Sequence, residues 1–211
     1  MTTLDQLKRA VAKQAADLRT QGLRAELPES GKRLQLATAI MLDRPRGDVG
    51  LQRLWRMAAI CHCAKLAAHG KWAEADAAIP LRLSSSVPAP APCTSEEEKL
   101  YAMMLVNKSV CRLMKTQLTA DPIRDEALNR LFQIDSPMLR RWTGVMWMVN
   151  ALDSTATATE RQRQAVQALR FISNKRQPKL HTLAMRHRRL TLPRPLRIEL
   201  VAGECVYYFN E

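Results

Sequence analysis

The chain has 211 residues, 46% apolar and 25% charged, which is enough for one hydrophobic core or for two small helical units that share one. The formal net charge of +13 points to an anionic partner and says nothing about the fold. The longest apolar stretch, residues 142–152, is too short to cross a bilayer, and the N-terminus has no apolar signal core, so we expect no membrane partner and a cytoplasmic location. Five cysteines, an odd number scattered through predicted helices, indicate free thiols in a reducing compartment.

Helical periodicity dominates the first half of the chain. Apolar residues recur at helical intervals over residues 3–21, 30–43 and 48–69, and the interruptions fall at Gly22 and at residues 44–47. The scarcity of glycine, with seven in the whole chain, also favours a mainly α-helical protein. Three helices are therefore expected in this part of the chain.

A fourth, short helix is expected over residues 72–79, ended by Pro80. The turn before it, residues 70–75, reads GKWAEA: glycine permits a tight turn, the tryptophan fits between two helices, and the alanines allow close approach. This stretch resembles the turn of a tetratricopeptide-type helical hairpin, which implies an antiparallel helix pair. Because no second copy follows at a fixed period, we expect a helix pair and not a repeat array.

Residues 84–93 divide the chain. Three serines are followed by prolines at every second position, a composition typical of an extended linker. We therefore predict an N-terminal helical region (1–83), a Pro/Ser linker (84–93) and a C-terminal helical region (94–211). The linker either separates two lobes or runs across the surface of one.

A long helix is predicted after this linker. Thr94 and Glu97 have the spacing of a capping box, and residues 96–98 place three glutamates at the positive end of the helix dipole. We interpret these carboxylates as capping groups and not as metal ligands. The methionine-rich apolar stripe that follows is interpreted as core and not as a cofactor site.

Two further helices are predicted where an N-cap residue precedes a proline, at Asp121–Pro122 and at Ser136–Pro137. The second helix contains the apolar run 142–152, which surrounds more than half of its circumference. We favour a central core helix and keep a subunit interface as the alternative.

The last predicted helix is capped by Thr157 and Glu160, and Val166, Leu169 and Ile172 are expected to face inward. In this arrangement the arginines of the helix would lie on its outer side.

The period changes after residue 174. Apolar residues alternate over residues 196–200 and 205–209, on either side of the turn 202–204, and this pattern predicts a β-hairpin over residues 194–209. Residues 183–192 leave room for one more strand, which would include residues 186–189. The predicted fold is mainly α: an irregular helical bundle of about seven helices with a small C-terminal β-hairpin.

From residue 161 to residue 197 the chain carries eleven basic side chains and no acidic one. Nine are arginines, whose planar fork of donors matches a phosphate group in two-point contact and stacks on bases. We predict all of them as nucleic-acid-binding residues: Arg161, Arg163, Arg170, Lys175, Arg176, Lys179, Arg186, Arg188, Arg189, Arg194 and Arg197.

Like charges at this density repel one another unless an anionic partner compensates them. Residues 93–153, in contrast, hold equal numbers of acidic and basic side chains. A nucleic-acid backbone supplies the missing negative charge, because binding exchanges its condensed counterions for these side chains. Three alternatives remain: a solvated basic surface without a specific partner, an acidic protein, and an anionic membrane surface.

The type of nucleic acid is open between RNA and DNA. The sequence contains no helix-turn-helix, zinc or zipper pattern, so we expect backbone contacts with little sequence specificity. Single-strand binders use aromatic side chains, and those near the basic segment are Phe171, Tyr207, Tyr208 and Phe209. Such contacts suit a subunit of a larger nucleoprotein complex, such as an RNA-guided effector complex or a plasmid or phage replication assembly.

Enzyme signatures are absent from the sequence. Cys61-His62-Cys63 lacks the second ligand pair of a zinc site, and buried thiols are the favoured interpretation, although a Cys–His nucleophile pair stays open. No glycine-rich phosphate loop, HExxH or GxSxG motif occurs, and the basic segment offers no carboxylates for a metal-dependent nuclease. We therefore expect no catalytic activity, no cofactor and no metal.

A second hypothesis belongs to a different class. The chain would be a helical protein–protein adaptor that binds an acidic partner through the tetratricopeptide-like hairpin at Trp72 and the helix over residues 142–152. Salt-sensitive binding of nucleic acid by the purified protein would distinguish the two hypotheses.

Overall fold

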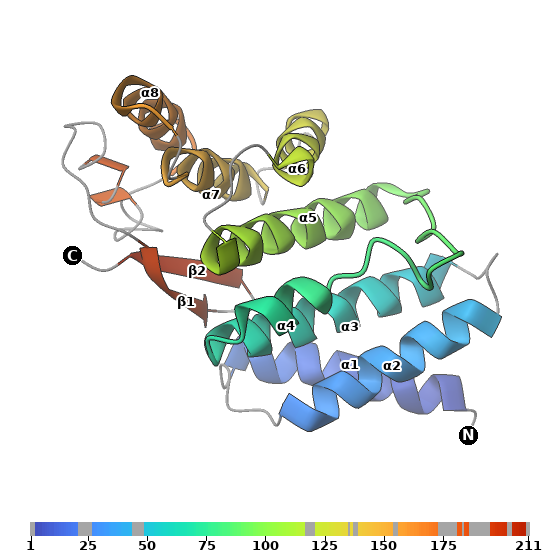
Figure 1. Cartoon of the computed structure of the whole chain (residues 1–211). Coiled ribbons are helices and arrows are strands. Elements are labelled where there is room, and N and C mark those ends of the chain that lie inside the picture. Colours follow the sequence, from blue (N-terminus) through green and yellow to red (C-terminus); the bar gives the residue numbers. More distant parts are fainter. Residues whose placement is uncertain are drawn as a thin grey trace.

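The computed structural model describes residues 3–20, 27–43, 49–116, 121–134, 136, 139–153, 156–172, 181–182, 184–185, 195–201 and 204–209. Side chains are described throughout these ranges except at residues 3, 14–20, 116 and 141 and in the two strands. Helices account for most of this part of the chain, so the mainly α-helical fold predicted from the sequence is confirmed (Figure 1). Eight helices lie within the described ranges, where about seven were predicted.

The first four helices form the lower half of the molecule in Figure 1. They are α1 (Thr3–Thr20), α2 (Leu27–Asp43), α3 (Val49–Ala68) and α4 (Trp72–Ala77). Helix α3 packs against all three of the others and also against α5, so most of its residues are buried, the polar Gln52, Arg56 and Lys65 included. It is the central helix of this half.

The turn between α3 and α4 forms the expected helix pair. Gly70 has φ +71°, in the left-handed region that favours glycine, and the amide of Lys71 donates to the Leu66 carbonyl at 3.0 Å. Trp72 packs against the core at the start of α4. The helix ends at Ala77, two residues earlier than the sequence suggested, and the side chain of Lys108 donates to the carbonyls of Asp76 and Ile79 around that end.

The segment between α4 and α5 is not extended throughout. The amide of Leu83 donates to the Val87 carbonyl at 2.9 Å and the amide of Ala89 donates to the Leu81 carbonyl at 3.2 Å, so the serine-rich stretch folds back on itself. The serines take part in this turn, since the Ser84 hydroxyl accepts the Val87 amide at 3.2 Å, and this local bonding overrides the extended state that the prolines favour.

Helix α5 (Ser95–Thr116) joins the two halves of the molecule (Figure 1). It contacts α3 and α4 on one side and α6 and α7 on the other, and one cluster of buried apolar residues runs from α1 to the end of α8. Residues on both sides of the Pro/Ser segment therefore contribute to the same core. The division of the chain into two regions stays a prediction.

The upper half consists of α6 (Pro122–Gln133), α7 (Arg140–Ala151) and α8 (Ala158–Leu169). Asp121 caps α6 as predicted, because its carboxylate accepts the Ile123 amide at 3.1 Å. Helix α7 begins at Arg140, later than the predicted start at Ser136. The Ser136 carbonyl accepts the amides of Leu139 and Arg140 at 2.9 and 3.2 Å, and the first predicted helical residues, 137 and 138, lie outside the described residues.

Helix α7 is a core helix, and this was the favoured interpretation. Trp142, Met146 and Met148 are each at most 2% exposed. The segment that follows α8 lies close against it at Gly144, where a Cβ atom would approach Cγ1 of Ile172 to 2.6 Å. Glycine fits this position because the side chains of Ile172 and Phe171 occupy the space that a larger side chain would need.

The chain ends in two antiparallel strands, β1 (Pro195–Val201) and β2 (Glu204–Phe209), with Ile198 opposite Tyr207. Their side chains and the connecting turn lie outside the described residues, so the hairpin over residues 194–209 stays a prediction. The expectation of a further strand that begins at residue 183 is wrong for Ala184 and Met185, which are helical. Ala184 is fully buried, so tertiary packing and not the local alternation determines its conformation.

Candidate nucleic-acid interface

The capping box of α8 fixes which arginines reach the surface. The Thr157 hydroxyl accepts the Glu160 amide at 3.2 Å and the Glu160 carboxylate accepts the Thr157 amide at 2.7 Å, as predicted. From this start Arg163 and Arg170 fall one heptad apart on the exposed side of the helix, whereas Arg161 is half-buried.

The prediction that Val166 of α8 faces inward is wrong. Val166 is 37% exposed, and Ala165 and Ala168 form the buried stripe instead. Alanines allow α8 to approach α7 closely, which turns the helix so that valine lies between the two arginines. We call Arg163, Val166 and Arg170 the outer face of α8.

The rest of the predicted basic segment is placed only in part. Seven of the eleven residues lie outside the described residues: Lys175, Arg176, Lys179, Arg186, Arg188, Arg189 and Arg194. Arg197 belongs to β1, where the side chains are not described. Their contribution to an interface stays a prediction.

Acidic and basic side chains pair with one another in the stretch from α4 to Asp153, which we call the middle region. Asp76 lies 2.8 Å from the amine of Lys108 and 3.3 Å from the guanidinium of Arg112, which also lies 2.9 Å from Asp121. Burial alone would raise the pKa of Asp76, but its hydrogen bonds and charge contacts with Lys108 and Arg112 hold that pKa below its ordinary value. Similar pairs join Arg124 to Asp153 and Arg130 to Glu98 and Glu126.

The three glutamates at the start of α5 are all engaged by basic side chains. Glu97 and Arg56 form a pair at 2.8 Å with both side chains fully buried, Glu98 contacts Arg130 at 2.8 Å, and Glu96 contacts Lys99 at 2.6 Å. The Thr94 hydroxyl accepts the Glu97 amide at 3.3 Å, as expected for a cap. These contacts account for the carboxylates without a metal ion.

The arginines of α8 differ in this respect from the basic residues of the middle region. None of the ion pairs found in the described ranges involves Arg161, Arg163 or Arg170; the nearest acid along the helix, Glu160, is held by the cap at Thr157. Arg163 lies near Glu160 and lowers the pKa of that carboxyl, after the larger effect of the hydrogen bonds from Thr157. The positive charge on this face is therefore left mostly to the solvent or to a partner.

An aromatic cluster, Phe132, Trp147 and Phe171, lies in the same half of the molecule. The ring of Phe132 is 6.2 Å from that of Trp147 and 6.3 Å from that of Phe171, centroid to centroid, at interplanar angles of 61° and 67°. Both contacts are edge-to-face, and Phe132 is 56% exposed. The sequence indicated Phe171 but not the other two, because α6, α7 and the end of α8 supply one ring each.

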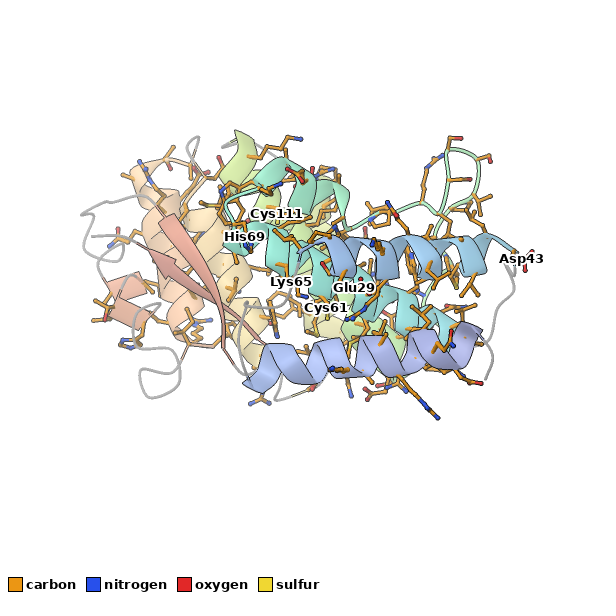
Figure 2. The ribbon with its side chains drawn as sticks, turned by 90° about the horizontal axis from the view of Figure 1, so that it is seen from below. Glu29, Asp43, Cys61, Lys65, His69 and Cys111 are labelled. Atoms are coloured by element: carbon orange, nitrogen blue, oxygen red, sulfur yellow. The ribbon has the colours of Figure 1, made fainter. Side chains whose placement is uncertain are left out.

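The Cys61-His62-Cys63 stretch, which suggested metal or nucleophile chemistry, lies on α3. Cys61, Lys65 and His69 follow one another along α3 and the turn after it, and Cys111 belongs to α5 (Figure 2). Cys61, Cys63 and Cys111 are buried thiols, and the sulfur atoms of Cys63 and Cys111 lie 3.7 Å apart. Within the described ranges no group of three or more metal-ligating side chains converges.

His62 does face a hydroxyl, that of Ser30. The two atoms, Ser30 Oγ and His62 Nδ1, are 2.8 Å apart, but the same hydroxyl donates to the Leu27 carbonyl at 2.8 Å. The Ser30 hydroxyl thus lies between the Leu27 carbonyl and the His62 ring, and Ser30 is fully buried, so the pair joins α2 to α3 in the interior. Burial and the nearby charge of Lys65 lower the pKa of His62, which favours the neutral imidazole.

No protein family model, curated protein or solved structure matches this chain. No helix in the described part of the chain has both the length and the apolar character needed to cross a membrane.

Proposed function

We propose that this chain is a non-catalytic nucleic-acid-binding subunit of a larger nucleoprotein complex, which contacts the backbone of RNA or DNA through its Arg-rich C-terminal surface. An RNA-guided effector complex and a plasmid or phage replication assembly are settings that suit such a subunit. The observation that carries the proposal is the outer face of α8, where Arg163 and Arg170 are exposed without an ion pair among the described residues.

Two arguments favour an anionic polymer as the partner. The middle region neutralises its own charges, so the net charge of +13 resides largely elsewhere, and the basic segment holds eleven of the 33 basic side chains without an acidic one. Arginines on one helical face also match the repeated phosphates of a nucleic acid better than a single carboxylate would.

The adaptor hypothesis has less support. Trp72 packs half-buried against the core, and the apolar side chains of α7 are buried except for Trp147, which is half-buried. The two elements of the adaptor hypothesis therefore place most of their apolar surface within the fold.

The experiment is a salt titration of nucleic-acid affinity. With five phosphate contacts to a duplex, log affinity against log salt should fall with a slope of about −4.5, at about 0.9 per contact. The double variant Arg163→Gln/Arg170→Gln removes two contacts and should flatten this slope by about 1.8 while it weakens binding to unrelated sequences alike. Replacement of Arg186, Arg188 and Arg189 together by alanine tests the remainder of the segment in the same way.

The matched control is Lys8→Gln/Lys13→Gln, which removes two exposed positive charges from α1. It changes the net charge by the same amount and should leave affinity and slope nearly unchanged. Equal weakening by both variants, or no binding of RNA or DNA near physiological salt with or without natural partners, would contradict the proposal.

A further inference from the structure

We infer that the aromatic cluster is a stacking site for the bases of single-stranded nucleic acid, with the outer face of α8 as the contact for its phosphates. The inference rests on the proposed function and narrows its ligand from any nucleic acid to an unpaired strand. It adds Phe132 and Trp147, which lie outside the basic segment, to the residues that contact the ligand.

Phe132 is an exposed aromatic side chain on α6. Phe132 lies near the end of α6, where it is exposed although Leu128, one turn earlier, and the adjacent Leu131 are buried. A phenylalanine there adds nothing to helix propensity and exposes 56% of its surface. In the described part of the chain, the ring of Phe132 makes edge-to-face contacts with Trp147 and Phe171.

The ring of Phe132 is held in a defined orientation. Edge-to-face contacts hold the ring of Phe132 at steep angles to the rings of Trp147 and Phe171. An exposed ring held in this way is able to stack a nucleobase, and this contact does not depend on the identity of the base. The bases of a duplex already stack within the helix, so only an unpaired strand can use the site.

Two arginines of α8 supply positive charge in the same half of the molecule as the aromatic cluster. Arg170 directly precedes Phe171 in the chain, and Arg163 and Arg170 lie two helical turns apart on the outer face of α8. Arginines next to aromatic rings allow backbone and bases of one strand to be bound together. An apolar protein partner would make no use of these charges.

The test compares ligands of equal length by fluorescence anisotropy with the full chain: oligo-dT, oligo-U, a DNA duplex and a strand of abasic sugar-phosphates. We expect the base-bearing strands to bind more tightly than the abasic strand. Phe132→Ala should weaken binding of the base-bearing strands by about 5- to 150-fold, and it should leave duplex affinity and the salt slope unchanged because no phosphate contact is lost.

Two further variants separate stacking from folding and from general apolar contact. Phe132→Tyr keeps a ring and should bind as the wild type does, whereas Phe132→Leu keeps an apolar side chain and should behave as Phe132→Ala does. Leu36→Ala removes another exposed apolar side chain, on α2, and should have no effect. Circular dichroism confirms that each variant is folded.

The outcomes distinguish this inference from the proposed function. If no nucleic acid binds, the proposed function fails and the inference with it. If strands and duplex bind but Phe132→Ala binds as the wild type does, or if the abasic strand binds equally well, the inference alone is overturned. It is overturned as well if Phe132→Leu retains strand affinity, or if Phe132→Ala abolishes binding of a co-purifying protein without any change in strand affinity.

Discussion

Arg56 and Glu97 are both fully buried, and each has several polar partners. The Arg56 guanidinium donates to Glu97, to the Gln52 side chain and, at 2.7 Å, to the Pro90 carbonyl. The second carboxylate oxygen of Glu97 accepts the amide and the thiol of Cys93 at 3.0 and 2.9 Å. A buried ion pair is stable only when its remaining donors and acceptors are satisfied, and these contacts supply most of that requirement.

The first residue-scale prediction concerns stability against pH. Burial would raise the pKa of Glu97, but the hydrogen bonds from Cys93 and the charge of Arg56 outweigh it and hold the pKa below its ordinary value of 4.5. Ionised Glu97 therefore stabilises the fold above that value, and this contribution is lost as the pH falls through the lower, folded pKa. Glu97→Gln should reduce the free energy of unfolding at neutral pH by about 3–5 kcal/mol, because the charge of Arg56 is left uncompensated. It should also make the free energy of unfolding fall less steeply as the pH is lowered.

Urea unfolding at a series of pH values measures both effects. Glu96→Gln is the control, since Glu96 is an exposed neighbour on the same helix turn, and it should change the pH profile little. The double variant Arg56→Met/Glu97→Gln should be more stable than Glu97→Gln alone, because it removes the unpaired charge. A Glu97→Gln profile that parallels the wild type would disprove the assignment.

At the scale of elements, the contact between α7 and α8 positions the proposed interface. Gly144 lets the segment after α8 lie against α7, and that segment contains Phe171 and Ile172. Ala165 and Ala168 provide the same closeness along α8 itself. Small residues on both helices therefore determine where Phe171 and the outer face of α8 lie relative to Phe132.

Gly144→Val should displace the end of α8. The new Cβ would lie 2.6 Å from Ile172 Cγ1 and 3.3 Å from Phe171 Cβ. Overpacking of this kind lowers the free energy of unfolding by about 1–3 kcal/mol. The higher helix propensity of valine offsets only a few tenths of a kcal/mol of this loss. Thermal unfolding should show the loss, and strand affinity should fall as well because Phe171 moves out of the aromatic cluster.

Gly70→Ala is the matched comparison for this variant. No atom lies within 4 Å of the added Cβ, but φ is +71°, so backbone strain costs about 1–2 kcal/mol at a turn far along the chain from the interface. It should reduce stability by a similar amount and leave strand affinity unchanged. If Gly70→Ala also weakened strand binding, the effect of Gly144→Val would reflect stability alone.

At the scale of the whole molecule, the two predicted regions are joined by buried polar contacts as well as by the core. Arg56 on α3 binds Glu97 on α5, and Lys108 and Arg112 on α5 bind Asp76 on α4. Neither region could keep these groups satisfied without the other, and each lone buried charge would destabilise it.

We therefore expect the chain to unfold as one cooperative unit. Far-ultraviolet circular dichroism and tryptophan fluorescence should give coincident urea transitions, and a chain cleaved within residues 84–87 should stay associated and folded. Separate transitions, or a stable isolated fragment of residues 94–211, would show that the regions are independent domains.

Local pattern was sufficient for much of this fold. The caps at Asp121 and Thr157 and the core position of α7 depend on residues within one or two helical turns of each other, and they are confirmed. Arg163 and Arg170, one heptad apart, are both exposed. Such features follow from helix geometry and capping chemistry, which a single segment carries in its own sequence.

Features that join distant segments could not be predicted in this way. The aromatic cluster takes its rings from three elements, the partner of Glu97 lies 41 positions earlier in the chain, and Val166 faces outward because Ala165 and Ala168 fit α7 more closely. The apolar period of α8 is compatible with more than one inward stripe, and a charged side chain in a sequence does not reveal its partner. Packing between helices selects one arrangement, because only that arrangement fills the space at Gly144 and pairs the buried charges.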